Sequence, residues 1–568
     1  MSSYYDRLSR ERKQLQADDQ LPSWMTTAGY QLFKEKYLWA ETPRKQYETI
    51  ATVLASHTDD LPKWKDKFFN LLWKGWLSPS TPVLANTGTT RGLPVSCSGG
   101  YIMDSIDGFY SARREAALLT KHGFGTSGYL GDIRPRGTPI SSGGKASGVL
   151  PVIQGFVQDS RDVSQGGVRR GSWAGYLPMD HGDFHEVISY LEKMPDDLNI
   201  GWNISDDFLS RLKAGDKDAA ARFSLSLKTK LITGKGYYYF PDKANRALPV
   251  YYPISTKASN LCSEIMLPSD AEHTFTCVLS SMNVAKYDEW KETDAIFDAT
   301  VFLDCVASEF IERASGIPGL ENAVRFTRKA RSLGLGVCGF HTYLQSKLIP
   351  MDSLEAVYFN DELFNKLNEE SWRASCWMGD AWGIPEWVQN FADNEIPSGG
   401  WWPRNASRLA VAPTKSTALI MGGISEGINP DPAMTYTQST AGGEMDRINP
   451  LLLEIMKERG KYTPAVLKDL TAKFGSVQHV DWLSDEEKAA FKTAFEIDQH
   501  VLIRLASQRA KYLDQWQSVN LFFSADADPR KVVEVHKAAF MDENIRALYY
   551  VYSKAGVGAA KDECVVCQ

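Results

Sequence analysis

Long apolar stretches are absent from this chain of 568 residues, and no run reaches the roughly 20 residues that a membrane-spanning helix needs. The N-terminal sequence MSSYYDRLSRERKQ is too charged for a secretory signal peptide. Cysteine is scarce, with 8 residues scattered along the chain. They are too few for a disulfide framework. These absences argue against a membrane or secreted protein. They favour the reducing cytoplasm, which would be the host cytoplasm if the source is viral.

A surplus of positive charge is also missing, because the formal net charge is -7. This balance gives no general surface for a nucleic-acid polymer, although local arginines can still bind phosphates. What is present is ordinary for a soluble globular protein, with 43% hydrophobic and 23% charged residues. The length exceeds one small core, so we expect one large α/β domain with appendages, or several domains.

Helical periodicity is clearest near the N-terminus. Residues 1 to about 75 contain TPRKQYETIATVLASH and LPKWKDKFFNLLWKGW, in which apolar residues recur every three or four positions. Further helices are predicted over 108–121, over most of 293–384 and over 450–520. Strands are predicted in RFSLSLK and GYYYFPDKAN. The segment that begins at Ser78 is rich in Pro, Gly, Ser and Thr, which is typical of loops and short strands.

One cysteine stands between an amide and a carboxylate in the stretch NLCSE. Alternation in an extended segment would place Asn260, Cys262 and Glu264 on one side. That side would combine a hydrogen-bonding amide, a thiol capable of one-electron chemistry and a proton acceptor. Cys277 follows Cys262 by 15 residues, which is too wide for a metal knuckle but suits neighbouring strands or loops. A buried cysteine is more often a small core residue, so this stretch alone defines no function.

Several other segments offer groups for binding. They are Thr81; Ser96, followed directly by Cys97; the glycine-rich HGFGTSGYLGDIRPRG; the loop SQGGVRRG with Gln165 and Arg169; and APTKST, whose Thr414, Ser416 and Thr417 lead into a short helix. Hydroxyls and free amides at a helix start can bind phosphate, and arginines bind anions. A glycine turn, a solvated loop and a plain helix cap explain the same residues without any ligand.

The C-terminal sequence AGVGAAKDECVVCQ ends in a pair of thiols, Cys564 and Cys567. Zinc would need two more ligands, and none lie nearby in the sequence. A dithiol on a small, polar, flexible segment suits thiol–disulfide exchange between sites. Upstream, Tyr549 and Tyr550 stand side by side at the end of a predicted strand. Neighbouring side chains of a regular strand point to opposite faces, so stacked rings would require an irregular backbone.

Nine pieces in this order together resemble the catalytic (large) subunit of class I ribonucleotide reductase, over roughly residues 75 to 568. They are STPVLANTG, SCSGG, SQGGVRRG, NLCSEI, TFTCVLSSMN, RSLGLGVCGF, APTKST, ALYY and CVVC. The resemblance implies a ten-stranded α/β barrel of two five-stranded halves, with a central finger loop that carries Cys262. The domains expected are a helical segment at 1–75, the barrel with its effector-binding loops at 76–552, and a flexible redox-active tail at 553–568.

The resemblance also implies a reaction, the reduction of ribonucleotides to 2′-deoxyribonucleotides. Cys262 would become a transient thiyl radical that removes the 3′ hydrogen, Glu264 would accept the 3′-hydroxyl proton, and Asn260 would hold the substrate hydroxyls. Cys97 and Cys277 would supply two reducing equivalents and end as a disulfide. The tail thiols would then re-reduce it. The remaining assignments are Thr81, Ser96, Thr414, Ser416 and Thr417 for substrate, mainly its phosphates, and Tyr549 and Tyr550 for relaying the radical.

Partners follow from the same resemblance. A separate ferritin-like beta subunit would hold the metal-radical cofactor, so no metal site is expected in this chain. Thioredoxin or glutaredoxin would supply electrons. A deoxynucleoside triphosphate or ATP effector would bind Asp104 and Arg134 at the interface of a homodimer. The loop with Gln165 and Arg169 would report the identity of the effector to the substrate base.

Two features depart from the family pattern. Trp173 is bulky where a small residue is expected, which affects the predicted contacts with the base. About eighty residues precede Thr81, and none resemble the ATP-cone domain, so an overall on/off site for ATP and dATP is not expected.

Three alternatives stay open. An adenosylcobalamin-dependent (class II) reductase would not need the relay that Tyr549 and Tyr550 suggest. A non-catalytic nucleotide-binding regulator would not need the redox cysteines. A thiol oxidoreductase that uses only the tail cysteines would leave Cys262 and Glu264 unexplained. The sequence also leaves open whether nucleoside diphosphates or triphosphates are preferred.

Overall fold

Helices fill the first part of the chain, as the periodicity predicts. The computed structural model describes residues 4–553 except 142, 166–168, 395–400 and 441–442. The first elements are α1 (Tyr4–Ala17), α2 (Thr27–Leu32), the π-helical η1 (Phe33–Tyr37), α3 (Pro43–Ala55) and α4 (Leu61–Trp73). Proline is the first residue of α3 and the second residue of α4, and the side chains of Thr42 and Asp60 cap the two helices. Both helices pack against α13 (Ala295–Ala314), so this segment shares the main core.

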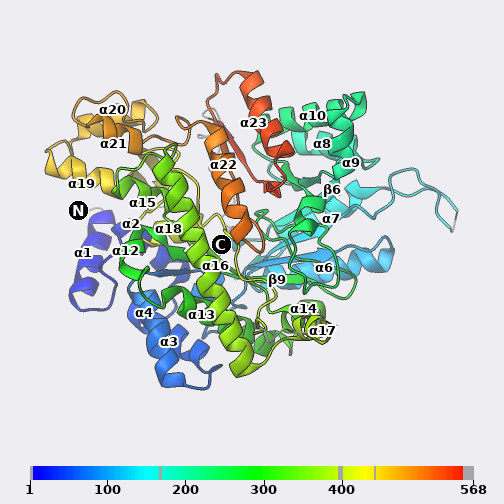
Figure 1. Ribbon diagram of the computed structural model, residues 1–568, viewed down its shortest axis with the longest axis horizontal. Helices are drawn as coiled ribbons and strands as arrows, with labels where there is room; N and C mark the ends of the chain where they lie inside the picture. Colours follow the sequence, from blue (N-terminus) through cyan, green and yellow to red (C-terminus); the bar gives the residue numbers. More distant parts are fainter. Residues whose placement is uncertain (1–3, 142, 166–168, 395–400, 441–442, 554–568) are drawn as a thin grey trace.

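Five parallel strands form one half of a curled sheet. In spatial order they are β2 (Cys97–Tyr101), β3 (Gly125–Tyr129), β6 (Trp173–Pro178), β7 (Asn199–Asn203) and β8 (Tyr237–Tyr239). Parallel neighbours need long crossovers. These contain α6 (Ile106–Lys121), α7 (Val149–Asp162), α8 (Phe184–Lys193), α9 (Asp206–Lys213) and α10 (Lys217–Thr233). Figure 1 shows the crossover helices gathered on the right of the molecule.

Strand β9 (Phe275–Asn283) joins this half to the rest of the sheet. Its first residues pair antiparallel with β2, its last residues pair antiparallel with β1 (Leu77–Pro79), and β10 (Leu333–Cys338) runs parallel beside it. Single bridges from Leu335 to Leu409 and from Val411 to Gln517 extend the sheet further. The second half therefore contains β1, β9, β10 and the extended segments at 409–411 and 517. The expected α/β barrel is confirmed.

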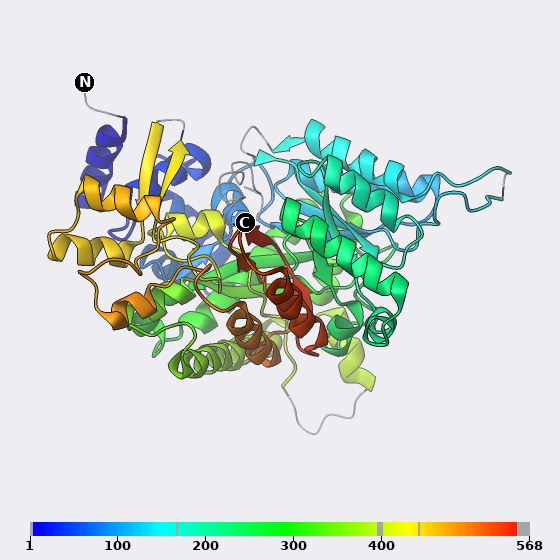
Figure 2. The same cartoon turned by 90° about the horizontal axis from the view of Figure 1, so that it is seen from above.

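The last strands lie between the two halves. β14 (Ala547–Leu548) pairs antiparallel with β8, and β15 (Val551–Ser553) pairs parallel with β13 (Leu521–Phe523). Figure 2 shows the last described residues near the centre of the molecule. Within the described ranges, no helix combines the length and apolarity that crossing a membrane requires.

The remaining elements complete the chain. They are α5 (Thr81–Asn86), β4 (Ser164–Gln165), β5 (Arg169–Arg170), α11 (Pro241–Arg246), η2 (Val284–Lys286), α12 (Tyr287–Trp290), α14 (Glu321–Ala330), α15 (Phe340–Ser346), α16 (Leu354–Trp382), α17 (Glu386–Asn394), α18 (Lys415–Ile420), β11 (Thr435–Thr440), β12 (Gly443–Ile448), α19 (Pro450–Glu458), α20 (Pro464–Ala472), α21 (Asp485–Ala490), α22 (Gln499–Arg509), η3 (Ala510–Tyr512) and α23 (Pro529–Met541). The helices predicted over 108–121, 293–384 and 450–520 are present, the last two with interruptions.

One strand prediction is wrong. RFSLSLK lies inside the helix α10 and not in a strand. Its alternating pattern is misleading because Phe223 and Leu227, four residues apart, form the buried stripe of a helix. Asp216 caps the start of this helix, and Gly234 ends it in a left-handed conformation. GYYYFPDKAN, in contrast, contains the predicted strand as β8.

Helix α2 packs against α18 and approaches it very closely at Gly29. A Cβ atom on Gly29 would lie 2.8 Å from the carbonyl oxygen of Ile420 and 2.9 Å from that of Leu419. These separations are too short for a side chain, so the two backbones meet only because residue 29 is glycine.

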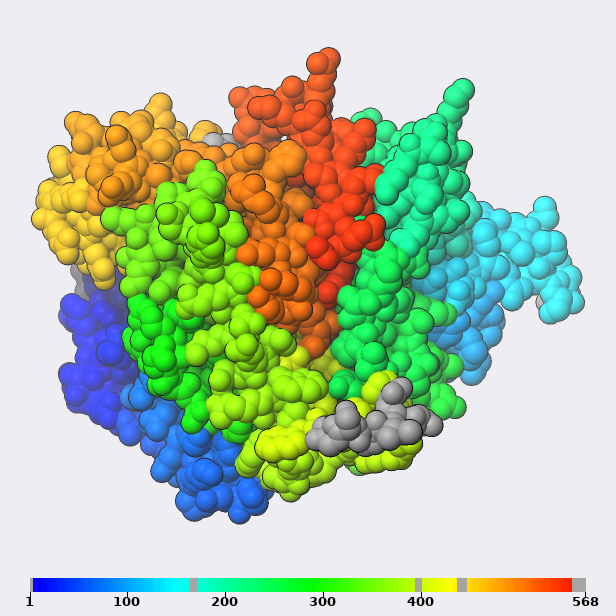
Figure 3. All heavy atoms as spheres, in the orientation of Figure 1, coloured from blue at the N-terminus to red at the C-terminus, as the bar shows by residue number. Residues whose placement is uncertain are grey.

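Figure 3 shows the N-terminal helices, in blue, at the lower left of the visible face, below the yellow and orange segment that includes α20 and α21.

Candidate active site

The loop that carries Cys262 is a tight turn, so the predicted extended conformation is wrong. Ser263 has φ 61°, in the left-handed region, and its amide donates to the carbonyl of Asn260 at 3.3 Å. The turn still brings the predicted groups together. Asn260 Nδ2 donates to Glu264 Oε1 at 3.0 Å, and Asn260 Oδ1 accepts the amides of Glu264 and Ile265, both at 3.2 Å. A reversal of the chain, and not strand alternation, places the amide beside the carboxylate.

Both halves of the sheet hold this loop in a buried position. Ser127 of β3 donates to the carbonyl of Ser259 at 2.7 Å, and Tyr176 of β6 donates to that of Asn260 at 2.6 Å. From the other half, Ser518 Oγ contacts the carbonyl of Cys262 at 2.8 Å and Glu264 Oε2 at 3.2 Å. The fixed hydrogen bonds leave the loop little freedom, which suits a site that must hold its groups in register.

Two further cysteines face each other beside the loop. Cys97 of β2 and Cys277 of β9 are direct partners in the antiparallel register. Asn260 Nδ2 also lies 3.3 Å from Cys97 Sγ, so one amide contacts both the carboxylate and a thiol. On the other side, Gln515 Nε2 lies 3.3 Å from Cys277 Sγ. Asn260 therefore links Glu264 to Cys97, Ser518 links Glu264 to the main chain of Cys262, and Cys277 faces Cys97 across the strands.

A glycine on β10 leaves room for the second thiol. A Cβ atom on Gly334 would lie 2.9 Å from Cys277 Sγ and 2.4 Å from a methyl carbon of Leu279. Gln515 and Ser518 were not found by sequence reasoning. Their only signal is a pair of polar residues in QWQSVN, a stretch with no spacing that points to catalysis.

Burial controls the protonation of this group. Removal from water raises the pKa of Glu264 to about 7, although hydrogen bonds from Asn260 and Ser518 oppose the shift. Burial, and then the charge of Glu264, raise the pKa of Cys97 well above its usual value. The pKa of Cys277 is raised for the same reason, burial first. The carboxyl group is thus poised to take or release a proton near neutral pH, while the two thiols stay protonated.

The predicted phosphate-binding residues lie at the ends of short elements near this group. Thr81 opens α5, two residues after β1, and Ser96 directly precedes β2 and Cys97. Thr414 precedes α18 with φ 60°, and its Oγ1 accepts the amide of Gly427 at 2.7 Å. Thr417 is buried and Ser416 is half-buried. Helix α18 contacts β1, and α5 begins two residues after β1. The APTKST segment, which leads into α18, therefore lies near the start of α5.

The two tyrosine rings meet where the chain changes partner strands. Tyr549 and Tyr550 lie between β14, which pairs with β8, and β15, which pairs with β13. Their ring centroids are 4.0 Å apart, with 46° between the planes, so the rings are in close contact but tilted and not stacked. The change of partner strand gives the irregular backbone that this contact between neighbours requires. Both rings belong to the same buried apolar cluster as Cys262. Sequence reasoning missed Tyr237, whose hydroxyl donates to that of Tyr550 at 3.3 Å.

The predicted effector residues fall into two groups. Arg134 and Asp104 form an ion pair at 2.5 Å on the partly exposed side of the first half. Gln165 and Arg169 are opposite each other in the hairpin of β4 and β5, and their side chains lie outside the described part of the structure. Trp173 is buried and stacks on Phe156 of α7 at 4.5 Å. Its bulk therefore occupies the core beneath this region. Cys564 and Cys567 lie outside the described residues.

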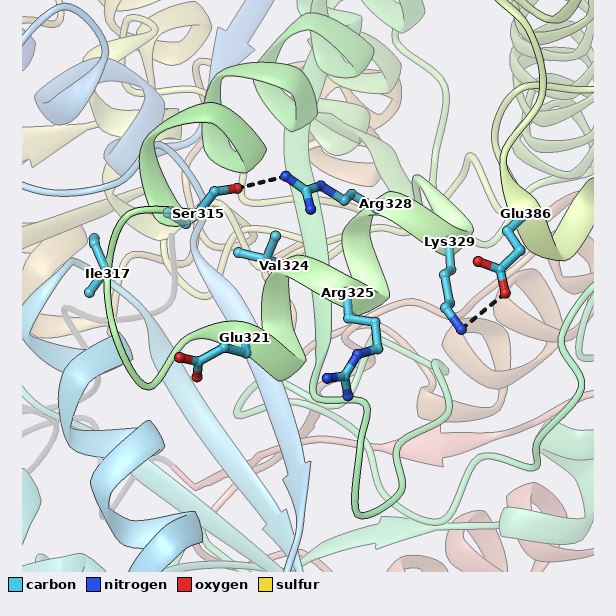
Figure 4. A pocket seen from close by; sticks show the side chains of 9 residues that line it. Ser315, Ile317, Glu321, Val324, Arg325, Arg328, Lys329 and Glu386 are labelled. Carbon is cyan, nitrogen blue, oxygen red and sulfur yellow. Dashed lines mark hydrogen bonds and ion pairs between the residues drawn. The ribbon is translucent and has the colours of Figure 1, made fainter.

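A pocket and a cluster of metal-ligating side chains lie elsewhere. The pocket has about 330 Å³ and is lined by residues of α14, including Arg325, Arg328 and Lys329; Figure 4 shows Lys329 paired with Glu386. No sulfur atom lines it. In the described ranges, one group of three potential metal ligands occurs, at His57, Glu309 and Glu312. His57 and Glu309 already pair at 2.9 Å, and Glu312 is exposed, so two of the three groups are engaged with each other.

Comparison with known proteins places these residues in a family. The description "Ribonucleotide reductase, barrel domain" matches residues 95–225 and 218–551, and "Ribonucleotide reductase, all-alpha domain" matches 24–92. A putative ribonucleoside-diphosphate reductase large subunit of Frog virus 3 is 33% identical, over 91% of this chain and 94% of its own length. A vitamin B12-dependent ribonucleoside-diphosphate reductase of Thermoplasma acidophilum is 29% identical, over 81% of this chain and 62% of its own length.

A solved structure agrees in fold and in sequence. The class Id ribonucleotide reductase alpha subunit of Actinobacillus ureae superposes with a TM-score of 0.85 and 34% identity, covering 94% of this chain and 98% of that one. The family matches span most of the chain, and the likeness extends over both halves of the barrel and the helical segment. The chain belongs to the ribonucleotide reductase large-subunit family.

Proposed function

We propose that the chain is the catalytic subunit of a ribonucleoside-diphosphate reductase, and that the buried group around Asn260 is its active site. The observation that carries the proposal is the position of one amide, Asn260 Nδ2, in contact with both Glu264 Oε1 and Cys97 Sγ. Cys97 in turn faces Cys277 across the strands. A hydrogen-abstracting thiol, a proton acceptor and a reducing dithiol are the three components that replacement of a ribose hydroxyl requires.

The proposed steps use these groups in order. The thiyl radical of Cys262 takes the 3′ hydrogen, and Glu264 accepts the 3′-hydroxyl proton while Asn260 holds the ribose hydroxyls. The 2′-hydroxyl then leaves as water. The Cys97 and Cys277 thiols provide two electrons and the protons that balance the reduction, and they become a disulfide. Cys262 finally returns its hydrogen to the 3′ carbon and becomes a radical again.

The radical is proposed to come from a separate ferritin-like beta subunit, whose metal-radical cofactor supplies the oxidising equivalent. The close contact of the Tyr549 and Tyr550 rings supports this assignment, because the pair offers a path for a proton-coupled electron inside the cluster that contains Cys262. The matched solved structure is titled a class Id alpha subunit, whereas one relative is named vitamin B12-dependent. The adenosylcobalamin-dependent alternative therefore remains the second candidate.

Reduction and regulation complete the proposal. The tail thiols Cys564 and Cys567 would re-reduce the active-site disulfide and would themselves be reduced by thioredoxin or glutaredoxin. A deoxynucleoside triphosphate or ATP would act at Asp104 and Arg134 in a homodimer, and the hairpin with Gln165 and Arg169 would pass its identity to the substrate. The Arg134–Asp104 ion pair supports a charged, partly exposed position for such a site.

The test is an assay of CDP and CTP reduction with a radical-loaded ferritin-like subunit, and separately with adenosylcobalamin and no partner. The substitutions Tyr549→Phe and Tyr550→Phe keep each ring but remove the phenolic hydroxyl. Each should therefore abolish partner-dependent reduction while nucleotide binding is retained. Turnover with adenosylcobalamin alone, or near-normal partner-dependent turnover by both variants, would favour the second candidate. Comparison of CDP with CTP decides between diphosphates and triphosphates.

A further inference from the structure

A lysine is fully buried beside the tyrosine pair. Lys230 lies on α10, and its Nζ donates to the carbonyl of Gly236 at 2.8 Å and to the carbonyl of Tyr549. No carboxylate pairs with it in the described ranges, because none of their salt bridges includes it. Burial lowers the pKa of Lys230 to about 7. A buried ammonium without a counter-ion is costly, so its presence at this position calls for an explanation.

The two carbonyls belong to the two segments that carry the aromatic group. Gly236 directly precedes Tyr237 at the start of β8, and Tyr549 lies where the chain passes from β14 to β15. The Tyr237 ring lies 4.9 Å from Tyr549 and 5.5 Å from Tyr550. Lys230 thus ties the irregular stretch of the tyrosine pair to the regular strand that supports it.

We infer that Lys230 is a positioning residue of the radical relay, which fixes the main chain of Tyr549 so that the Tyr549 and Tyr550 rings stay in close contact and Tyr237 stays in contact with both. The inference rests on the proposed relay function of the pair. On the β13 side, the amide of Tyr549 donates to the carbonyl of Val519 at 2.9 Å, and the carbonyl of Tyr550 accepts the amide of Leu521 at 3.0 Å. On the β8 side, strand pairing ends at Leu548. Lys230 supplies the restraint on that side, because it reaches both the start of β8 and the carbonyl of Tyr549.

The same side chain also lies near the rings of Tyr237 and Tyr238, with its Nζ 5.9 Å and 5.2 Å from their centroids. His536 of α23 also faces it, and burial lowers the pKa of His536 to about 4, so the imidazole is neutral near pH 7. Where Lys230 is protonated, its charge disfavours an oxidised Tyr237 ring that keeps its phenolic proton. Oxidation of Tyr237 would then release that proton together with the electron, which leaves a neutral radical.

The test is Lys230→Met in the full chain with its radical-loaded partner subunit. Methionine has a similar length but neither charge nor donors. We expect kcat for nucleotide reduction to fall at least tenfold, while KM for the nucleotide stays within twofold. With 3-aminotyrosine, a more easily oxidised analogue, at position 550, the amount of radical trapped there, measured by electron paramagnetic resonance, should fall in parallel.

Lys243 provides the matched control. It is also a buried lysine that binds two carbonyls, those of Phe540 at 2.7 Å and Asp542 at 2.8 Å, but it does not contact the tyrosine pair. Lys243→Met should therefore change kcat by less than threefold even if it lowers the melting temperature as much. Equal kcat values in the Lys230 and Lys243 variants would overturn the inference.

Two further results separate the possible failures. If Lys230→Met does not fold, Lys230→Gln, which keeps a donor, is measured in the same way. Failure of both to fold while the Lys243 variant folds would make Lys230 a residue of the fold alone and overturn the inference. Loss of activity in Tyr549→Phe and Tyr550→Phe with normal activity in Lys230→Met refutes the positioning role only, whereas active tyrosine variants refute the relay itself.

Discussion

Cys97 and Cys277 occupy directly opposite positions on the antiparallel strands β2 and β9. Opposed residues in such strands have Cα atoms about 4.5 to 5.5 Å apart, which lies within the range of disulfides at about 4.4 to 6.8 Å. The two thiols can therefore be joined and separated with little movement of the main chain. Both cysteines are buried in the sheet, so a separate group has to carry reducing equivalents to them.

The tail thiols, Cys564 and Cys567, are predicted to carry reducing equivalents to the Cys97–Cys277 pair. In the double variant Cys564→Ser and Cys567→Ser, thioredoxin-driven turnover should stop, while the pre-reduced enzyme should still give a single round of product. The reason is that the substitutions leave the active-site thiols intact. Quenched samples analysed by mass spectrometry should then contain the Cys97–Cys277 disulfide. Unchanged thioredoxin-driven turnover would show that the tail has no role in re-reduction.

Replacement of the central thiol should stop the chemistry and spare the fold. Cys262→Ser is nearly isosteric, and the loop keeps the hydrogen bonds that Ser127, Tyr176 and Ser518 make to its main chain. A serine hydroxyl does not form an accessible radical, so multi-turnover reduction should fall below detection. Nucleotide binding, measured by calorimetry, should remain within twofold. Appreciable turnover by this variant would remove Cys262 from the mechanism.

The reduction rate should rise with pH through neutrality. Burial raises the pKa of Glu264 to about 7, and the proposed proton acceptor works only as the carboxylate, which predominates above that value. We expect kcat/KM to increase from pH 6 to pH 8 and to level off above it. Glu264→Gln keeps the shape but accepts no proton, so it should lose at least a hundredfold in rate at pH 8. A flat profile in the unmodified enzyme would contradict the role.

A second buried carboxyl group, that of Glu115, should affect the stability of the protein and not its catalysis. Burial raises the pKa of Glu115 on α6 to about 7, against a hydrogen bond from Thr274 at 2.8 Å. The folded state then holds a proton that the unfolded state releases above about pH 4.5, so this group lowers stability as pH rises from about 4.5 to 7. Glu115→Gln should raise the melting temperature more at pH 8 than at pH 5. An equal effect at both values would contradict the raised pKa.

The free energy of unfolding should depend strongly on Asp304, the acid in a buried ion cluster behind the second half of the sheet. Asp304 Oδ1 pairs with Arg331 at 2.8 Å, and its Oδ2 pairs with Arg404 at 2.9 Å; these charges hold its pKa well below the usual range. Asp304→Asn leaves two arginines partly uncompensated and should cost about 3 to 5 kcal/mol. The control is Asp352→Asn, which breaks an exposed pair with Lys492 and should cost below about 1 kcal/mol. Urea unfolding measures both, and similar costs would contradict the prediction.

Local sequence predicted the chemistry better than the geometry. The residue types of Asn260, Cys262 and Glu264 indicated a site only together with the other pieces of the family resemblance. The turn at Ser263 was not visible, because a left-handed serine has no sequence signature. Gln515 and Ser518 were missed for a different reason. They reach the site from about 250 residues away in the chain, and such contacts depend on how the barrel closes.

The same distinction applies to the larger elements. Helical periodicity in the first 75 residues and the α/β barrel were predicted from patterns and from the resemblance, and both are present. RFSLSLK was assigned to a strand because a short alternating pattern fits either period, and only the packing of Phe223 and Leu227 decides between them. The close contact of the Tyr549 and Tyr550 rings depends on a change of partner strand, which no local pattern contains.

The close approach of Gly29 to α18 links the N-terminal helices to the proposed phosphate contacts. Helix α18 follows Thr414 and carries Ser416 and Thr417, the proposed contacts, and its last carbonyls lie against the backbone of α2. A side chain at residue 29 would displace the C-terminal end of this short helix. A substitution there is therefore expected to act on the proposed phosphate contacts from outside them, through the position of the helix that carries them.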